Sequence, residues 1–139
     1  MANTIEGKIL DALCSHLSTL VFSPAIPVAY PNVDFTPSSG DFLEVVFLPN
    51  QTNTMNLSGG RYNHVGLFQV SVWSPKGAGA INALDIAGQI VEHFNFNTNL
   101  ANDGISVKIS ARAWIAAPLQ EGDRIQVPVT IPYMSNAGA

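Results

Sequence analysis

The sequence predicts an α+β fold: a mostly antiparallel β-sheet with two α-helices packed on one face. Two segments repeat apolar residues at helical spacing, one near the N-terminus and one in residues 80–94. Several other runs are rich in β-branched and aromatic residues and are bounded by Gly, Pro, Asn or Asp, which is typical of strands. The predicted order is helix, several strands, helix, two strands, and this order favours an α+β arrangement over alternating β-α units.

The first helix is predicted within residues 1–22. Asn3 or Thr4 can cap it, because a short polar side chain can accept a hydrogen bond from a free backbone N–H of the first turn. Apolar residues then recur every four positions and form one face, which we expect to pack on the sheet. They are Ile5, Ile9, Leu13 and Leu17. Cys14 lies in the same segment and is interpreted as a small buried residue.

Strands are predicted wherever apolar residues alternate or run together over a few positions. The last predicted strand, residues 124–133, contains Pro128 and Pro132, which are an even number of positions apart. Both lack an N–H toward the same lateral side, which predicts an unpaired edge or a bulge there. Residues 95–104 are predicted to be a loop. The predicted strands are 26–30, 41–49, 54–57, 64–73, 105–115 and 124–133.

The second helix is predicted from Ala80 to Phe94. Ile81 and Leu84 lie on one side of it, and Ile86 and Ile90 lie on another, so that much of its circumference is apolar. Such a helix is usually enclosed on two sides, and we expect this one to be sandwiched.

The whole chain, residues 1–139, is predicted to be a single domain. Residues 50–63 are polar and rich in Asn and Gly, which predicts a flexible loop or an arm that becomes ordered on assembly. Residues 134–139 follow the last strand and are predicted to fray.

The composition indicates a protein that meets other proteins. Charged residues make up 12% of the chain, about half the usual ~25%. Hydrophobic residues make up 47%, which leaves few charges to cover the surface of a solitary subunit. The formal net charge of −4, with six scattered basic residues, argues against specific nucleic-acid binding, which needs a clustered basic face.

The N-terminus has no basic segment followed by a long apolar core, and we therefore expect no signal peptide. No apolar run approaches 18 residues, and we expect no membrane span. The protein is expected to be cytosolic where it is made. Its single cysteine excludes an internal disulfide and any multi-cysteine metal site.

The segment Ser71–Phe94 raises the question of a phosphate site, because a strand, a Gly-rich turn with Lys76 and a helix follow one another. A P-loop places its lysine after the glycines and follows it with Ser or Thr. Here Lys76 precedes Gly77 and Gly79, and no Ser or Thr follows. The segment is therefore interpreted as a corner between a strand and a helix.

No other pattern supports catalysis, a cofactor or a metal. His16, His64 and His93 are isolated in sequence and form no metal-binding pair. No G-x-S-x-G elbow is present. Glu121 and Asp123 flank a glycine and are interpreted as a solvated turn. We expect no catalytic, cofactor-binding or metal-ligating residue.

Three stretches together resemble a bacteriophage family, the tail-terminator-like proteins of long-tailed phages. The first is the strand motif R-x-x-H-x-G-x-F-Q-V-x-V, from Arg61 to Val72, followed by the corner Pro75, Gly77 and Gly79. The second is the closing motif Q-V-P-V-x-I-P-Y, from Gln126 to Tyr133. The third is the upstream Pro-Gly turn that leads into a strand and then Leu-Pro. The resemblance covers about residues 35–133.

The resemblance implies a structural virion protein that forms a ring, commonly a hexamer. Such a ring caps the tail tube, ends tail polymerisation and presents a surface for head attachment. The implied partners are copies of itself, the tail tube protein and the head-tail connector protein, while DNA passes through the lumen without specific binding. The implied location is the head-proximal end of the virion tail, after assembly in the host cytoplasm.

A subunit or tube interface is expected at large amphipathic and polar residues near the strand ends and the corner. These candidates are Asn56, Arg61, Tyr62, Asn63, Trp73 and Lys76. Two alternatives stay open. One is another neck or head-completion protein of similar fold, and the other is a small-ligand or peptide-binding α+β module.

Overall fold

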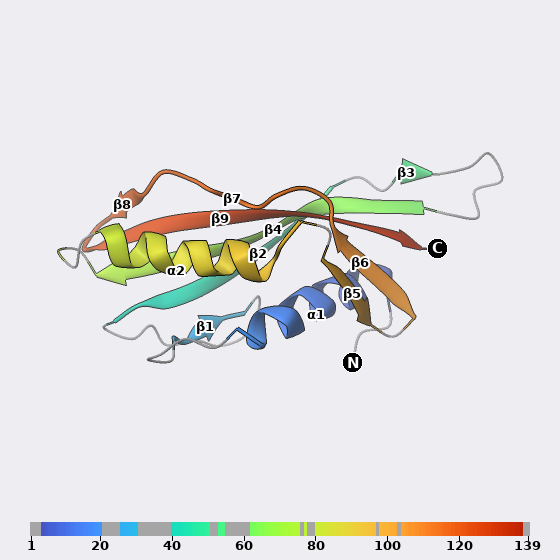
Figure 1. Cartoon of the computed structure of the whole chain (residues 1–139), viewed down its shortest axis with the longest axis horizontal. Helices are drawn as coiled ribbons and strands as arrows, with labels where there is room; N and C mark the ends of the chain where they lie inside the picture. The colour runs from blue at the N-terminus through green and yellow to red at the C-terminus, as the bar shows by residue number, and fades with distance from the viewer. Residues whose placement is uncertain are drawn as a thin grey trace.

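The chain folds into two helices that lie on one face of a curled β-sheet (Figure 1). The structure is a computed structural model and describes residues 4–20, 26–30, 40–50, 53–54, 62–75, 77, 80–96, 98–102 and 104–137. Helix α1 spans Ile5–Ser18 and helix α2 spans Ala80–His93. The predicted α+β class is confirmed.

The described part of the chain contains nine strands in one sheet. The strands are β1 (Val28–Ala29), β2 (Phe42–Pro49), β3 (Asn53–Thr54), β4 (Tyr62–Pro75), β5 (Asn99–Asn102), β6 (Ile105–Ile109), β7 (Trp114–Ile115), β8 (Leu119–Glu121) and β9 (Arg124–Ala137). The main path through the sheet is β1-β2-β4-β9-β6-β5, with β3 beside β4 and with β7 and β8 beside β9. Only the short β1 pairs in parallel, with β2, and the other described pairs are antiparallel.

Strands β4 and β9 form the centre of the sheet. They pair over their whole length, from Tyr62 opposite Ala137 to Pro75 opposite Arg124. The chain end therefore differs from the prediction that residues 134–139 fray. Met134 to Ala137 continue β9, and the Ser135 side chain is buried. Residues 138 and 139 lie outside the described part.

The core lies between the helices and one face of the β4–β9 pair. Phe68, Val70 and Val72 of β4 point to this face, and Phe68 lies directly opposite Ile131 of β9. The Phe68 ring meets Phe94, just after α2, with ring centroids 5.7 Å apart. All five side chains are inaccessible to solvent. Burial of this apolar surface is the main stabilising contribution to the fold.

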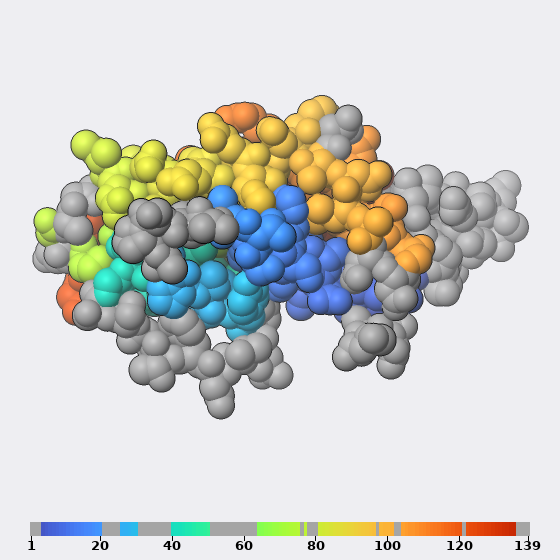
Figure 2. Space-filling model, turned by 60° about the horizontal axis from the view of Figure 1, so that its bottom comes forward, coloured from blue at the N-terminus to red at the C-terminus, as the bar shows by residue number. Residues whose placement is uncertain are grey.

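Helix α1 follows its predicted pattern closely. The Gly7 N–H donates to Thr4 Oγ1 at 3.2 Å, which confirms Thr4 as the N-cap. Ile9, Leu13 and Leu17 are buried against the sheet and α2. The helix ends at Ser18, before the predicted limit of residue 22. Figure 2 shows α1 in contact with α2 and with the β5–β6 hairpin.

Helix α2 begins and ends within one residue of the prediction but is covered on one side only. Ile86 and Ile90 are buried, whereas Ile81 is 85% exposed and Leu84 is 38% exposed. The expectation of a helix sandwiched on two sides is therefore wrong for a single subunit.

The segment after α2 also differs from the prediction. Residues 99–102, expected to be loop, form β5 and pair with β6. The single strand expected over 105–115 is divided, because β6 ends at Ile109 and β7 begins only at Trp114. Two short strands thus replace the one that the alternation of side chains predicted.

The side of β9 that carries Pro128 and Pro132 is not a free edge. Strands β6, β7 and β8 each pair with a short part of it. The prolines take part through their carbonyl groups, which accept hydrogen bonds from Ser110 N–H at 3.2 Å and Ala116 N–H at 2.9 Å. The missing proline N–H groups are the physical reason why pairing on this side is interrupted.

Of the segment 50–63, the structure describes Asn50, β3 and the first two residues of β4. The short strand predicted over 54–57 corresponds in part to β3, which pairs with β4. The rest of this segment lies outside the described residues. Among those that are described, no helix is long and apolar enough to span a membrane.

Candidate functional site

The structure describes three of the six predicted interface residues. Asn56, Arg61 and Lys76 lie outside the described residues. Tyr62 and Asn63 open β4, where their backbones pair with both β3 and β9. Of the three candidates that the structure describes, Tyr62 and Asn63 therefore lie together and Trp73 lies at the other end of β4.

Trp73 belongs to the opposite end of β4 and packs within its own subunit. Its ring stacks on Phe42 with centroids 6.0 Å apart, and its Nε1–H donates to Glu44 Oε1 at 3.2 Å. The guanidinium of Arg124 lies 4.9 Å from the centroid of the same Phe42 ring. The indole is thus half-buried in an aromatic cluster.

The corner between β4 and α2 has the features of a structural turn. Gly77 has φ of 94°, a conformation that glycine adopts readily. Asp41 lies beside this corner and accepts hydrogen bonds from Ser74 Oγ at 2.8 Å and Asn82 Nδ2 at 3.0 Å. A carboxylate already bonded to the first turn of α2 would repel a phosphate there, and the arrangement agrees with the interpretation of a corner.

Two histidines that are 77 residues apart in sequence meet where α1 and α2 end. The rings of His16 and His93 stack with centroids 4.1 Å apart and planes 12° from parallel. The Nε2–H of His16 donates to the His93 carbonyl at 2.8 Å, and the Nε2–H of His93 donates to the His16 carbonyl at 2.7 Å. Burial is the main reason why the pKa of His16 is lowered from 6.5, and the charge of His93 acts in the same direction.

Thr19 and Phe94 complete this contact. The Thr19 hydroxyl donates to the His16 carbonyl at 2.6 Å and lies 2.9 Å from His93 Nε2. The rings of Phe94 and His16 meet nearly perpendicularly, with centroids 4.9 Å apart and planes at 84°. The reciprocal hydrogen bonds engage a carbonyl group in the last turn of each helix, so the pair joins α1 to α2.

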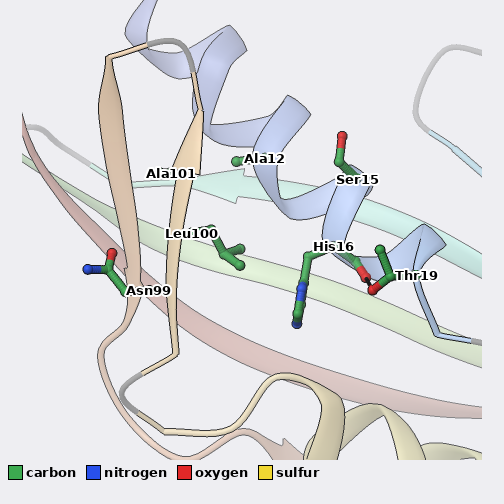
Figure 3. A pocket seen from close by; sticks show the side chains of 7 residues that line it. All are labelled: Ala12, Ser15, His16, Thr19, Asn99, Leu100 and Ala101. Carbon is green, nitrogen blue, oxygen red and sulfur yellow. Dashed lines mark hydrogen bonds between the residues drawn. The ribbon is translucent and has the colours of Figure 1, made fainter.

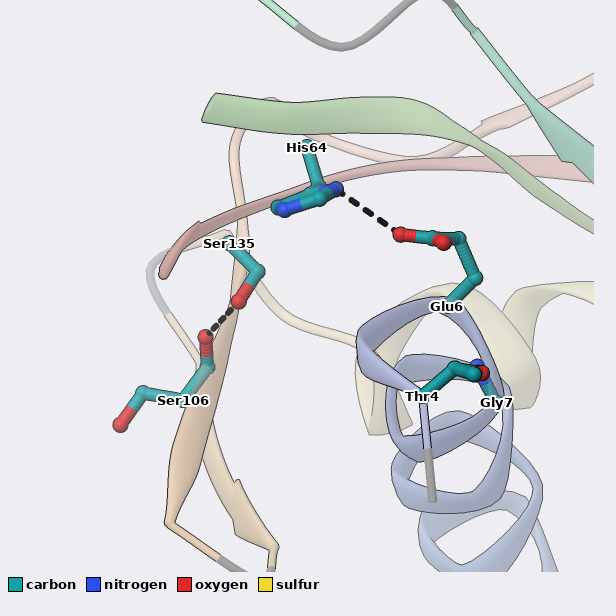
Figure 4. Close-up of polar contacts among 6 residues, drawn as sticks. All are labelled: Thr4, Glu6, Gly7, His64, Ser106 and Ser135. Atoms are coloured by element: carbon teal, nitrogen blue, oxygen red, sulfur yellow. Dashed lines mark hydrogen bonds and ion pairs between the residues drawn. The ribbon is translucent and has the colours of Figure 1, made fainter. Parts of the chain in front are cut away.

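A second polar contact joins the beginning of α1 to the sheet (Figure 4). His64 Nδ1 lies 3.1 Å from Glu6 Oε2, and His64 is 8% exposed. Next to it, Ser135 Oγ donates to the Ser106 carbonyl at 2.6 Å and ties β9 to β6. Burial, together with the nearby Glu6 carboxylate, raises the pKa of Tyr133 to about 12. These contacts hold α1, β4, β6 and β9 together.

A hollow of about 300 Å³ lies between α1 and β5 (Figure 3). The α1 side of it consists of Ala12, Ser15, His16 and Thr19, and the β5 side consists of residues 99–101. Figure 3 shows Leu100 projecting from β5 toward α1. Among the described residues, no Asp, Glu, Lys or Arg side chain lines it, which does not favour a site for an ionic ligand.

The face of the sheet opposite the helices carries polar side chains on β4 and β9. Gln126 Nε2 donates to Ser71 Oγ at 3.0 Å, and Gln69 Nε2 donates to Thr130 Oγ1 at 3.5 Å. Within the described residues, no helix covers this face.

Large exposed apolar side chains gather in two places. One is the outer side of α2, with Ile81 and Leu84. The other is the segment Trp114–Leu119, which contains β7 and the start of β8. Trp114 is 48% exposed, Ile115 is 37% exposed and Leu119 is 50% exposed. The sequence signal that could have found this segment is its large apolar side chains, Trp114, Ile115 and Leu119, with no charged residue between them.

The described residues include no group of three or more His, Cys, Asp and Glu side chains that could hold a metal ion. What the molecule does present is exposed apolar surface and uncharged strand edges. Both are features of proteins that assemble with other proteins.

Comparison with known proteins decides the family. The family model described as phage tail terminator protein matches residues 8–133, which is most of the chain. The chain belongs to the phage tail terminator family. It is therefore a structural protein of the phage tail, and its place is in the virion. The resemblance noted in the sequence is confirmed.

Solved structures agree on the fold of this terminator family member. One aligns over 96% of each chain with 26% sequence identity and a TM-score of 0.82. Another, from the virion of a native gene transfer agent particle, aligns over 98% of this chain and 100% of that chain, with 14% identity and a TM-score of 0.71. No curated protein sequence matches the chain.

Proposed function

We propose that this terminator forms a ring, most simply a hexamer, that caps the tail tube, ends its polymerisation and offers a surface for head attachment. The observation that carries this proposal is the family match over residues 8–133. The proposed partners are further copies of the chain, the tail tube protein and a head-tail connector protein. The proposed location is the head-proximal end of the tail.

The exposed apolar side chains support assembly. Ile81 at 85% exposure and Trp114 at 48% exposure are costly to leave in water. In a ring, every subunit has two flanks that meet neighbours and two faces that meet other virion proteins. A chain with 12% charged residues has the composition expected for so much contact surface.

The lumen of the ring is proposed to be neutral or acidic. DNA has to pass through it, and a basic lumen would retain DNA by neutralising its phosphates. The chain has ten acidic and six basic residues. Assembled rings are therefore expected not to bind duplex DNA at low salt. Salt-sensitive DNA binding by purified rings would contradict this part of the proposal.

The segment Asn50–Asn63 is proposed to contact a neighbouring subunit or the tube. Its sequence is polar, with two adjacent glycines and a single charged residue, Arg61. Hydrogen exchange of its backbone amides, measured by mass spectrometry, is expected to slow when rings form. Unchanged exchange across the segment, with slowing elsewhere, would show that it takes no part in assembly.

The proposal is tested by measuring the mass of the purified protein by native mass spectrometry, alone and with tail tubes of its own phage. We expect a discrete ring-sized oligomer, or a monomer that becomes one when tubes are added. Binding at the connector end of the neck without any effect on tubes would favour another neck or head-completion protein. A monomer that ignores tubes and binds a small ligand or peptide would favour a binding module instead.

A further inference from the structure

Strand β5 ends the sheet on one side, and no other described strand pairs with its outer edge. Ile109 N–H donates to the Thr98 carbonyl at 3.0 Å, and Asn99 lies opposite Lys108. Because hydrogen-bonded and non-hydrogen-bonded pairs alternate in an antiparallel ladder, Thr98 and Leu100 direct their backbone groups toward β6. The N–H and C=O groups of Asn99 and Ala101 therefore point outward.

The outer edge of β5 borders the hollow of about 300 Å³ beside α1. Helix α1 turns small side chains, Ala12 and Ser15, toward this hollow, and both Asn99 and Ala101 are exposed. An extended chain can therefore approach β5 closely enough for backbone hydrogen bonds. Strand addition of this kind takes its affinity from the backbone and its specificity from the side chains that enter the adjoining space.

The segment Trp114–Leu119 has the complementary edge. Trp114 lies opposite Thr130, and Ala116 N–H donates to the Pro128 carbonyl at 2.9 Å. By the same alternation, Ile115 directs its N–H and C=O away from β9. No other described strand pairs with β7 on that side.

We propose that the Trp114–Leu119 segment of one copy of this chain adds as a strand to β5 of the next copy, over the hollow between α1 and β5. This inference rests on the proposed ring and names the contact that closes it. Ala116 and Ala117 are small enough for the two backbones to approach. Trp114 and Leu119, about half exposed in the free subunit, supply the apolar contact on either side.

Charge and position favour a second copy as the occupant. Residues 113–120 include no Asp, Glu, Lys or Arg, and neither do the described residues that line the hollow. Strands β5 and β7 lie at separate places on the rim of the sheet in one subunit (Figure 1). A contact between two different surfaces of the same chain is head-to-tail, which is the type that closes a ring.

The test is chemical crosslinking between two single-cysteine variants. Cys14 is first replaced by alanine, and Ala101→Cys and Ile115→Cys are then made separately in this background. The two variants are mixed, assembled and treated with a short thiol-to-thiol crosslinker. We expect crosslinked dimers in the mixture and not in either variant alone. Rings of full mass without crosslinked dimers in the mixture would overturn the inference and leave the proposed function standing.

If neither variant nor the unmodified protein forms an oligomer, with or without tail tubes, then the proposed function fails and this inference fails with it. A crosslink found in Ile115→Cys alone would instead indicate a symmetric contact between two β7 strands. That result also overturns the inference, since a symmetric pair does not propagate around a ring.

A matched pair of substitutions on α1 provides a second readout. Ser15→Lys places a long charged side chain in the hollow, whereas Ser18→Lys places it on an exposed part of α1 outside the hollow. We expect Ser15→Lys to raise the protein concentration needed for ring formation at least tenfold. Ser18→Lys should leave that concentration nearly unchanged. Melting curves of both variants report whether the subunit is folded. Normal rings from a folded Ser15→Lys protein would contradict the proposed contact.

Discussion

Cys14 is the one cysteine of the chain, and its surroundings on α1 suppress its reactivity. Burial raises the pKa of its thiol from 9.0 to about 11, and the neighbouring Asp11 carboxylate acts in the same direction. The sequence predicted a small buried residue here, and the structure shows a partly buried one. The reactive species is the thiolate, whose population falls as the pKa rises.

We therefore expect thiol reagents to modify native Cys14 slowly. At about pH 8 the native protein has about a hundredfold less thiolate than a cysteine with a pKa of 9.0. Reaction with a chromogenic disulfide should accelerate by about that factor, or more, when the protein is unfolded in guanidinium. Equal rates in native and unfolded protein would show that the thiol is neither buried nor shifted.

The pair of His16 and His93 could not be predicted from sequence, because nothing in their separate surroundings links residues 77 positions apart. The structure places their rings 4.1 Å apart and gives each a carbonyl of the other helix as acceptor. The predicted second helix, residues 80–94, does place His93 in its last turn, as observed. The contact of His93 with His16 depends on how the two helices pack, which the local sequence does not reveal.

Stability is expected to fall in mild acid through His16. Its pKa is lowered in the fold, chiefly by burial, so the unfolded chain binds this proton more tightly than the folded chain. The stability that neutral His16 contributes is therefore fully present above its pKa in the unfolded chain, about 6.5. It is lost as the pH falls below that pKa. His16→Gln keeps a donor for the His93 carbonyl but does not titrate.

Melting temperatures measured from about pH 7.5 to about pH 5 check this expectation. The curve of His16→Gln should fall less steeply than that of the unmodified protein. Ser18→Ala, an exposed change on the same helix, should retain the original slope. A His16→Gln protein with an unchanged slope would assign the acid sensitivity to other groups.

At the level of elements, the sheet depends on the close approach of β2 and Tyr133 to Gly66 of β4. Gly66 of β4 lies where a Cβ atom would come within 2.6 Å of Tyr133 Oη, 2.7 Å of the Leu48 carbonyl oxygen and 2.8 Å of Pro49 Cα. Two of these three atoms are backbone and cannot move without shifting β2. Tyr133 also stacks on Phe47, with centroids 5.6 Å apart, so its ring is held on both sides.

Gly66→Ala is therefore expected to destabilise the protein by about 1–3 kcal/mol, through crowding in a packed sheet. Gly88→Ala is the matched control, because a Cβ there meets nothing within 4 Å and Gly88 lies inside α2. This second change should stabilise by about 0.5–1 kcal/mol. Chemical denaturation measures both. A Gly66→Ala protein as stable as the original would mean that β2 and β4 separate at little cost.

Element prediction succeeded where the pattern was strong and local. Both helices were found from their apolar repeats, and β4 and β9 from their β-branched residues. Strand β5 was missed because its Asn-Leu-Ala-Asn sequence has little strand preference and is a strand only through its pairing with β6. The end of β9 was expected to fray because nothing in its sequence reveals β4 beside it as far as Ala137.

For the whole molecule, fold class and family could be predicted, but the order of strands could not. Pairing of β4 with β9 joins segments about 60 residues apart, and such contacts leave little trace in local sequence. The exposed side of α2 also escaped prediction, because an apolar repeat does not tell whether a helix is covered by its own subunit or by another. Ile81, 85% exposed in the free subunit, is the clearest example.

Tail length in the phage is the most direct test of the central claim, that this protein acts by forming a ring that stops the tail tube. Electron micrographs of particles assembled without it should show tubes that exceed the normal length and carry no heads. Adding the purified protein during assembly should restore uniform tails. Tails of normal, uniform length in its absence would contradict the account.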